Sequence, residues 1–321
     1  MRGVRLHILV TTLFAVSGCG SSSVTPADFG VALDMHILSP TPLATVQTMT
    51  TCLAVDGAAV YWADYLGNVP TIQKASLDGA SHQQLAAGGD KNGCVAVDVN
   101  GVYYVEGDKI MKVALDGAGA MALALGQHVL RGPVTAGGYV YWITDVYGNV
   151  DAYNGKNAIV RLSTSSAGPV EVVSAEVVEL PGALVVDDAS VYYSDASGAW
   201  SRALAAPATA TAFGAQSTLH TNSMAAGGGR VAVAEVQSPG AGDIALFRTD
   251  GMGRVVVSPS VAQPLAVDAK GVYVKGASGL ERLALDGSGS TLLASETARA
   301  LVLSSDRVYF TDGARIYSLS R

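Results

Sequence analysis

Five acidic side chains recur at one point of a repeated sequence pattern. The pattern is a Val-Tyr-aromatic triplet, complete or degenerate, and each acid follows the middle residue of a triplet by three positions. These acids are Asp64, Glu106, Asp195, Glu235 and Asp312. Hard cations prefer several oxygen ligands, so carboxylates around one opening would suit Ca²⁺ or a cationic group, with Glu106, Asp195, Glu235 and Asp312 as the candidate metal ligands. The alternative, which we expect, is that each acid accepts hydrogen bonds from backbone N–H groups of the next turn.

Two cysteines occupy equivalent positions in the first two copies of the pattern. Cys52 and Cys94 each lie nine residues before the middle residue of their triplet. If equivalent strands of adjacent copies converge, their Cα atoms come within the roughly 4.4 to 6.8 Å that a disulfide requires, and closing this loop would stabilise the fold by about 4 kcal/mol. We predict this disulfide. The alternative is a pair of small buried thiols, because the other copies hold small residues at the same position: Gly132, Ala183, Ser223, Pro264 and Ala300.

The longest copy contains an insertion between Asp145 and Asn157 that mixes acids, amides and tyrosines with glycine. Long loops on a rigid scaffold often carry binding residues, and tyrosine supplies contact area at low entropic cost. The oxygen spacing of the insertion does not match an EF-hand. A merely tolerated insertion is the alternative. The predicted binding face joins this insertion to strand ends of copies one and four, and its residues are Asp64, Tyr65, Asn68, Asp145, Tyr147, Asn149 and Asp195.

Seven copies of the triplet follow one another along the chain. Their middle residues are separated by 42, 38, 51, 40, 41 and 36 positions. A period near forty residues is typical of propellers and solenoids. The middle residues are Tyr61, Tyr103, Tyr141, Tyr192, Ala232, Tyr273 and Tyr309.

Each copy contains the signals of four short antiparallel strands. In most copies an apolar run, such as residues 53–55, begins eight positions before the middle residue, and an aspartate such as Asp56 often closes it. An aspartate can hold a tight turn through hydrogen bonds to its own backbone. Asp-Gly pairs such as Asp78-Gly79 lie downstream and indicate hairpins. No window shows a convincing helical period, so helices should be scarce.

Three copies carry an aromatic-aromatic-x-Asp core, at residues 61–64, 192–195 and 309–312. This core resembles the Tyr-Trp-Thr-Asp repeats of receptor-type propellers and of related bacterial propeller lipoproteins, over nearly the whole mature chain. The resemblance implies an all-β propeller at residues 34–321, in which four-stranded antiparallel blades stack around an axis. The seven copies predict seven blades. Six blades, the number in receptor propellers of this type, is the alternative, because copies five and six have lost the aromatic core.

The two ends of the repeat region predict how the ring closes. Only twelve residues follow Tyr309, which is enough for three strands in the last copy but not for four. Residues 35–38, ahead of the first copy, form a spare apolar strand. We predict that this strand completes the last blade beside residues 314–319, because pairing the two termini in one sheet closes the ring.

The N-terminus has the order of an export signal. Arg2 and Arg5 precede a mostly apolar stretch, residues 6–16, which is shorter than the roughly 20 residues that cross a bilayer as a helix. Val16-Ser17-Gly18-Cys19 resembles the lipobox of bacterial lipoproteins, whose cysteine becomes the acylated N-terminus, for example with palmitate. The resemblance implies a signal peptide at residues 1–18 and a lipidated N-terminus and flexible linker at residues 19–33. In lipoproteins of double-membraned bacteria, the resemblance implies that Gly20 after the cysteine favours the outer membrane over the inner one. An ordinary secretory signal with an incidental cysteine is the alternative.

Charge narrows the range of partners. Removing the signal lowers the net charge from −7 to −9, because two arginines and no acid are lost, and so acidic a chain suits nucleic acid poorly. We expect a monomeric, extracytoplasmic scaffold of the cell envelope, anchored to the membrane through lipid on Cys19. Its predicted partner is a protein or an envelope glycan, and no cofactor other than a possible Ca²⁺ is indicated.

Two other classes of function stay open. In an exported lyase or lactonase, a metal would be held at the channel mouth by Glu106, Asp195, Glu235 and His220. His128 and His220 lie in connections expected on one face of the ring, but no metal-binding or catalytic-triad spacing accompanies them, and such histidines are usually solvated. The third class is an assembly factor that acts with other envelope proteins.

Overall fold

The structure is a computed structural model, and it describes residues 39–47, 50–66, 69–90, 93–145, 157–166, 168–174, 181–205, 209–213, 223–238, 241–259 and 263–321. Cys19 and the export signal lie outside these residues. All regular secondary structure in the described ranges is β-strand, which confirms that helices are scarce there. The same ranges contain no helix with the length and apolarity needed to cross a membrane.

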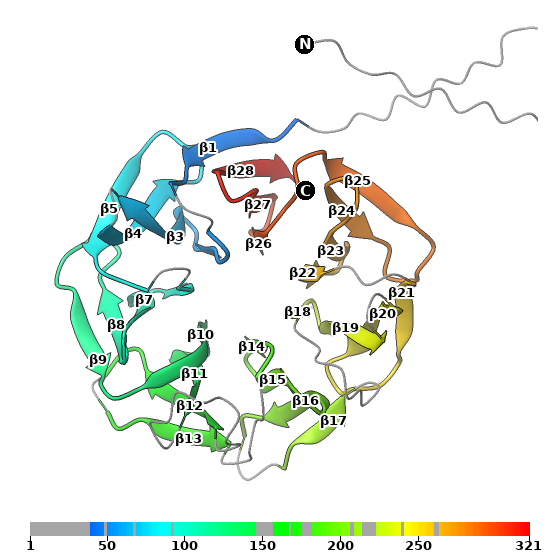
Figure 1. Ribbon diagram of the computed structural model, residues 1–321, viewed down its shortest axis with the longest axis horizontal. Coiled ribbons are helices and arrows are strands. Elements are labelled where there is room, and N and C mark those ends of the chain that lie inside the picture. The colour runs from blue at the N-terminus through cyan, green and yellow to red at the C-terminus, as the bar shows by residue number, and fades with distance from the viewer. Residues whose placement is uncertain are drawn as a thin grey trace, which may run out of the picture. The chain divides into compact units, whose positions relative to one another are not determined.

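Residues 39–321 form a propeller of seven blades, each a sheet of four antiparallel strands (Figure 1). The innermost strands are β2 (Ala54–Val55), β6 (Val95–Asp98), β10 (His128–Ala136), β14 (Leu184–Val186), β18 (Met224–Gly227), β22 (Gln263–Asp268) and β26 (Ala300–Leu303). The second strands are β3 (Ala59–Leu66), β7 (Gly101–Glu106), β11 (Tyr139–Asp145), β15 (Ser190–Asp195), β19 (Arg230–Ser238), β23 (Gly271–Lys275) and β27 (Arg307–Thr311). The third strands are β4 (Val69–Ser76), β8 (Lys109–Val113), β12 (Asn157–Ser163), β16 (Gly198–Ala203), β20 (Ala241–Arg248), β24 (Leu280–Leu283) and β28 (Arg315–Ser320). The outermost strands are β5 (His82–Ala87), β9 (Met121–Ala124), β13 (Glu171–Ser174), β17 (Thr211–Phe213), β21 (Val255–Ser258), β25 (Ser290–Ala294) and β1 (Thr41–Thr45).

The blade count predicted from seven triplets is confirmed, and the alternative of six blades is wrong. Every triplet lies in the second strand of its blade, including the degenerate copies in β19 and β23. Those two strands keep apolar side chains on both faces even though the full aromatic core is lost. Their middle residues Ala232 and Tyr273 are fully buried. Packing between blades therefore requires that the residue at this position be apolar, but it does not require that the residue be aromatic.

The ring closes in the predicted blade but with a different strand. In blade 7 the strand order is β1-β28-β27-β26, so the outermost strand comes from the N-terminal side and the other three from the C-terminal side. The strand that pairs with β28 is Thr41–Thr45. The prediction that residues 35–38 form this strand was therefore wrong in position, and those residues lie outside the described ranges. The outermost strand is largely solvent-exposed and contains Pro42. A search for an apolar run misses such a strand, since edge positions tolerate both polar residues and proline.

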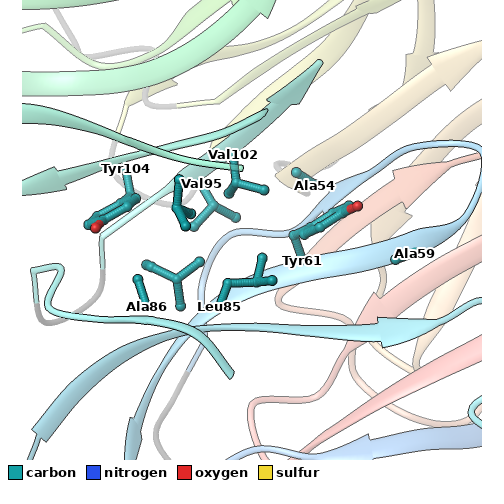
Figure 2. Packing of buried hydrophobic residues seen from close by; sticks show 10 residues of the cluster. Ala54, Ala59, Tyr61, Leu85, Ala86, Val95, Val102 and Tyr104 are labelled. Carbon is teal, nitrogen blue, oxygen red and sulfur yellow. The ribbon is translucent and has the colours of Figure 1, made fainter. Parts of the chain in front are cut away.

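Each blade buries both of its faces against its neighbours. Side chains alternate along a strand, so Tyr61 of β3 packs toward blade 2 with Tyr104, whereas Trp62 packs toward blade 7 with Tyr309. Figure 2 shows the first of these interfaces, with Tyr61 and Leu85 from blade 1 and Tyr104 from blade 2. The stabilisation thus comes from apolar surface shared between adjacent blades, which is why a single blade has no complete core of its own.

An aspartate and a tyrosine clamp the turn between the first and second strands of four blades. In blade 1, Asp56 Oδ1 accepts hydrogen bonds from the backbone N–H groups of Ala58 (2.7 Å) and Ala59 (2.8 Å), and Tyr61 donates its hydroxyl to Asp56 Oδ2 (2.8 Å). The same tyrosine-to-aspartate hydrogen bond recurs at equivalent positions. The other pairs are Tyr103 with Asp98, Tyr192 with Asp187 and Tyr273 with Asp268. The prediction that these aspartates hold the turns is confirmed. In each of these blades the middle tyrosine of the triplet also holds the turn, because it donates its hydroxyl to the aspartate.

This clamp predicts that the protein loses stability at alkaline pH. Burial, followed by the charge of Asp187, raises the pKa of Tyr192 from 10.0 to about 12, and burial together with the paired aspartate also raises the pKa values of Tyr61 and Tyr103. The folded state keeps these protons longer than the unfolded state, whose tyrosines titrate near about pH 10. The free energy of unfolding should therefore hold steady below about pH 10 and fall as the pH rises toward about 12.

Urea unfolding at a series of alkaline pH values measures this loss, and the variant Tyr192→Phe should show a shallower decline. The prediction fails if stability already declines well below the tyrosine range, or if Tyr192→Phe leaves the slope unaltered.

Candidate functional site

The two cysteines form a disulfide that joins the innermost strands of adjacent blades. Cys52 lies just before β2 and Cys94 just before β6. Their Cα atoms are 5.0 Å apart, and the two residues are 42 positions apart in the sequence. Strand β2 has only two residues, so its backbone pairing with β3 is short. The disulfide therefore attaches the least well paired innermost strand to the neighbouring blade.

The carboxylates at the ends of the second strands are arranged around one mouth of the ring, here called the first mouth, where the innermost strands begin. Asp64 is 6% exposed. Its Oδ1 accepts hydrogen bonds from the backbone N–H groups of Gln47 (3.1 Å) and Tyr65 (2.7 Å), and its Oδ2 accepts a hydrogen bond from Trp62 Nε1 (3.4 Å). Asp64 thus ties the segment that follows closing strand β1 to blade 1.

Asp195 and Asp312 organise the turns that follow their strands. Asp195 Oδ1 accepts hydrogen bonds from Ser197 Oγ (2.6 Å) and Trp200 Nε1 (3.0 Å) and from the backbone N–H of Ser197 (2.8 Å). Asp312 Oδ1 accepts hydrogen bonds from two backbone N–H groups, while Tyr317 donates its hydroxyl to Oδ2 (2.9 Å). These contacts lower the pKa of Asp312 in spite of its partial burial. These contacts agree with the expectation from the sequence that the acids accept hydrogen bonds from the next turn, as opposed to binding a metal ion.

Glu235 and Glu106 have different surroundings. Glu235 is 3% exposed and accepts a hydrogen bond from Arg254 Nε (3.1 Å), while the same guanidinium also reaches Asp243 Oδ2 (3.1 Å). Glu106 is half-buried and lies opposite Lys109 across the hairpin of β7 and β8. Burial, followed by the charge of Glu106, raises the pKa of Tyr104.

Within the described ranges, no three histidine, cysteine or acidic side chains converge as a metal site would require. The calcium site remains a prediction, because part of the first mouth lies outside those ranges. His128 begins β10 directly opposite Asp145, and both belong to the first mouth. His220, Asn68, Tyr147 and Asn149 lie outside the described residues.

A channel runs along the axis of the ring. It has a volume of about 480 Å³, and residues of all seven innermost strands line it. These strands surround the axis of the ring in Figure 1. The lining residues are alanine, valine, leucine, methionine and proline, apart from Thr135, whose hydroxyl donates a hydrogen bond to the carbonyl oxygen of Val97 (2.9 Å). Side chains of several of these residues pack between the blades. Sequence reasoning missed this channel as a site. The signal was present in the apolar runs of the innermost strands, which pack the blades and line the channel at once.

No family model matches the chain, and no curated protein matches it either. Solved structures do match. A chain of a mitotic checkpoint complex has a TM-score of 0.61 at 10% identity, with 93% of this chain and 99% of the other covered. Oligogalacturonate lyase in complex with manganese has a TM-score of 0.60 at 12% identity, with coverages of 86% and 89%. A gluconolactonase from Xanthomonas campestris has a TM-score of 0.51 at 14% identity, with coverages of 87% and 88%. At these identities the similarities show a shared β-propeller fold and nothing finer, because one fold serves many functions.

Proposed function

We propose that the chain is an exported, lipid-anchored binding scaffold of the cell envelope whose partner is a protein or an envelope glycan. The observation that carries this proposal is the use of the carboxylates at the first mouth. Asp64, Asp195 and Asp312 accept hydrogen bonds from neighbouring N–H and O–H groups, and Glu235 binds Arg254. The carboxylates that a catalytic or metal site would require are thus engaged in holding the ring rigid. A rigid ring is suited to presenting a binding surface to a partner.

Two further features support an exported location. A disulfide persists in oxidising surroundings outside the cytoplasm, and Cys52 and Cys94 form one. The segment that ends at Cys19 has the order of basic, apolar and small residues of an export signal. Acylation at Cys19 by more than one chain would anchor the protein stably, whereas a single chain gives only marginal binding.

Metabolic labelling with an alkyne analogue of palmitate tests the anchor. The wild-type protein should incorporate the label and partition into the detergent phase of a Triton X-114 extract. Cys19→Ser should lose both properties, while the control variant Cys52→Ser/Cys94→Ser should keep them. A wild-type protein that is exported without label would show that Cys19 is incidental, and the anchor would be rejected.

Variants of the predicted binding face test whether it binds the partner. Purified protein is incubated with isolated envelope glycan and, separately, with a detergent extract of the envelope from its own cells. Tyr147→Ala/Asn149→Ala should weaken the retained interaction at least tenfold, since aromatic anchors dominate many interfaces. Lys270→Ala, which lies in the turn between β22 and β23 at the opposite mouth, is the matched control. Equal effects of the two variants would exclude the predicted face.

The second candidate is an exported lyase or lactonase that holds a metal at the channel mouth. It is suggested only by the fold shared with oligogalacturonate lyase and with gluconolactonase. Calorimetric titration of metal-free protein with Ca²⁺ and with Mn²⁺ separates the two functions. The scaffold predicts no binding heat and no thermal shift. Saturable binding that is lost in Glu106→Gln would favour the enzyme.

A further inference from the structure

We propose that Glu106 and Tyr104, between blades 1 and 2 at the first mouth, form a recognition site for the ammonium group of a lysine side chain on a protein partner. This inference rests on the scaffold function proposed above and deepens it, because it names the chemistry of the partner. Two observations carry it. One is a buried tyrosine hydroxyl that has no hydrogen-bond partner in the described part of the chain, and the other is a neighbouring carboxylate that is unpaired there as well.

The buried hydroxyl belongs to Tyr104, which is 1% exposed. Within the described ranges this hydroxyl forms no hydrogen bond, whereas the buried tyrosines that clamp the turns each donate theirs to an aspartate. A buried polar group without a partner is unfavourable, so native proteins rarely keep one without a reason. The hydroxyl oxygen is not fully enclosed, and a group that enters between the blades can therefore reach it.

The carboxylate belongs to Glu106, two positions beyond Tyr104 in β7. Side chains at this spacing project from the same face of a strand, so both face blade 1, at the interface shown in Figure 2. Glu106 is half-buried, and among the described residues it forms neither a hydrogen bond nor an ion pair, not even with Lys109 opposite it. Burial, followed by the charge of Glu106, raises the pKa of Tyr104, so the hydroxyl stays protonated beside the carboxylate.

Residues 88–90, which lead from blade 1 to blade 2, hold these two side chains against one stretch of backbone. A Cβ atom on Gly88 would lie 2.3 Å from Glu106 Oε1, and one on Gly89 would lie 3.7 Å from the Tyr104 ring. Backbone N–H groups of this segment donate to carbonyl oxygens of blade 1 (2.8 Å) and of blade 2 (2.9 Å). The carboxylate and the hydroxyl are thus neighbours in a fixed setting, yet they are not hydrogen-bonded to each other, which leaves both for a donor placed between them.

An ammonium group suits this pair of oxygens better than an anion or a metal ion. All of its N–H groups are donors, so it can donate to Glu106 and to Tyr104 at once, and hydrogen bonds between ionised groups are the strong ones. An anion is repelled by the carboxylate. Ca²⁺ takes about six to eight oxygen ligands, and in the described ranges no three acidic, histidine or cysteine side chains converge.

The burial of Tyr104 favours lysine as the source of the ammonium group. Lysine carries its charge at the end of a flexible, unbranched stem, which can pass between the blades. The ammonium of an amino sugar is attached directly to a bulky ring and has no such stem. Arginine carries a wider planar group whose fork matches the two oxygens of one carboxylate, so it would leave the Tyr104 hydroxyl without a partner.

A titration followed by amide NMR shifts tests the site. The protein is the full chain with Cys19→Ser, so that no acyl chain requires detergent, and the probe is a capped glycine-lysine-glycine peptide. We expect saturable shifts of the amides of Gly88, Gly89 and Gly107. The same peptide with its lysine acetylated, which removes the charge, or replaced by arginine should bind about tenfold more weakly or worse, because a charged hydrogen bond is lost.

Three variants separate the site from general attraction to acidic residues. Glu106→Gln should abolish binding. Tyr104→Phe should weaken binding about tenfold and leave the urea midpoint of the free protein unchanged, because the hydroxyl that it removes has no partner to lose. Glu281→Gln is the matched control and should bind like the wild type. Glu281 is also half-buried and lies against Gly276 at the same mouth, but Val274 stands in β23 where β7 has its tyrosine.

The site is rejected if the lysine and acetyl-lysine peptides bind alike, if Tyr104→Phe binds like the wild type, or if Glu281→Gln loses as much affinity as Glu106→Gln. Glucosamine that binds more tightly than the lysine peptide would assign the site to a glycan and overturn the choice of a protein. The scaffold function fails separately. An envelope partner that is retained equally by wild type and Glu106→Gln would reject this site alone, whereas lysine binding without any retained partner would reject the scaffold.

Discussion

Replacing both Cys52 and Cys94 by serine is expected to lower the free energy of unfolding by about 4 kcal/mol. The disulfide closes a loop of 42 positions, and the chain-entropy model assigns about this value to a loop of that length. Serine fits the position sterically, because Ser223 already occupies it in blade 5. Urea unfolding followed by tryptophan fluorescence measures the change, with the slope fitted separately for each protein because the unfolded chain is more expanded without the cross-link.

Unfolding of the wild-type protein in the presence of a thiol reductant provides the matched control for this prediction. Wild-type protein in reductant should unfold on the same curve as Cys52→Ser/Cys94→Ser in the absence of reductant, and reductant should not affect the variant. Wild-type curves that coincide with and without reductant would mean that the bond between blades 1 and 2 contributes nothing to stability.

Arg254→Met is expected to lower the free energy of unfolding by about 3 kcal/mol. Glu235 is 3% exposed, so the variant leaves a buried carboxylate without its guanidinium, and breaking one side of a buried ion pair is costly. Removing both charges is cheaper than removing one. Glu235→Gln/Arg254→Met should therefore recover most of the loss, and a double-mutant cycle of urea midpoints gives the coupling.

A second arginine in the same blade serves as the control. Arg248 pairs with Asp250, but both side chains are exposed, and surface ion pairs of this kind contribute about 0 to 1 kcal/mol. Arg248→Met should thus be nearly neutral. If Arg254→Met were equally neutral, Glu235 would not depend on Arg254. If added Ca²⁺ restored the stability of Arg254→Met, the metal hypothesis for Glu235 would regain support.

The repeat predicted the architecture because a propeller is built from local signals. A period near forty residues, apolar runs before most triplets and aspartates such as Asp56 that close them all act within a single blade. The ring geometry then follows from the need of each blade to bury two apolar faces. Equivalent positions in adjacent copies converge for the same reason, which is why Cys52 and Cys94 could be paired from their spacing alone.

The candidate site could be predicted only in part. The sequence identified the acids at the strand ends and favoured a local role for them, but it did not identify their partners. Asp64 binds the backbone of Gln47, seventeen positions away, and Glu235 binds Arg254, nineteen positions away. Such partners depend on how separate strands are brought together. The position of the closing strand was missed for a related reason, because an exposed edge strand carries little apolar signal.

The sequence by itself determined the number of blades, the strands within each blade, the aspartate turns and the pairing of the cysteines, because these depend on periodicity and on contacts between equivalent residues. Only the tertiary structure decided which strand closes the ring, which groups the acids bind, and which residues line the axial channel. These features depend on contacts between separate strands or blades, and no periodic signal within a single copy specifies such contacts.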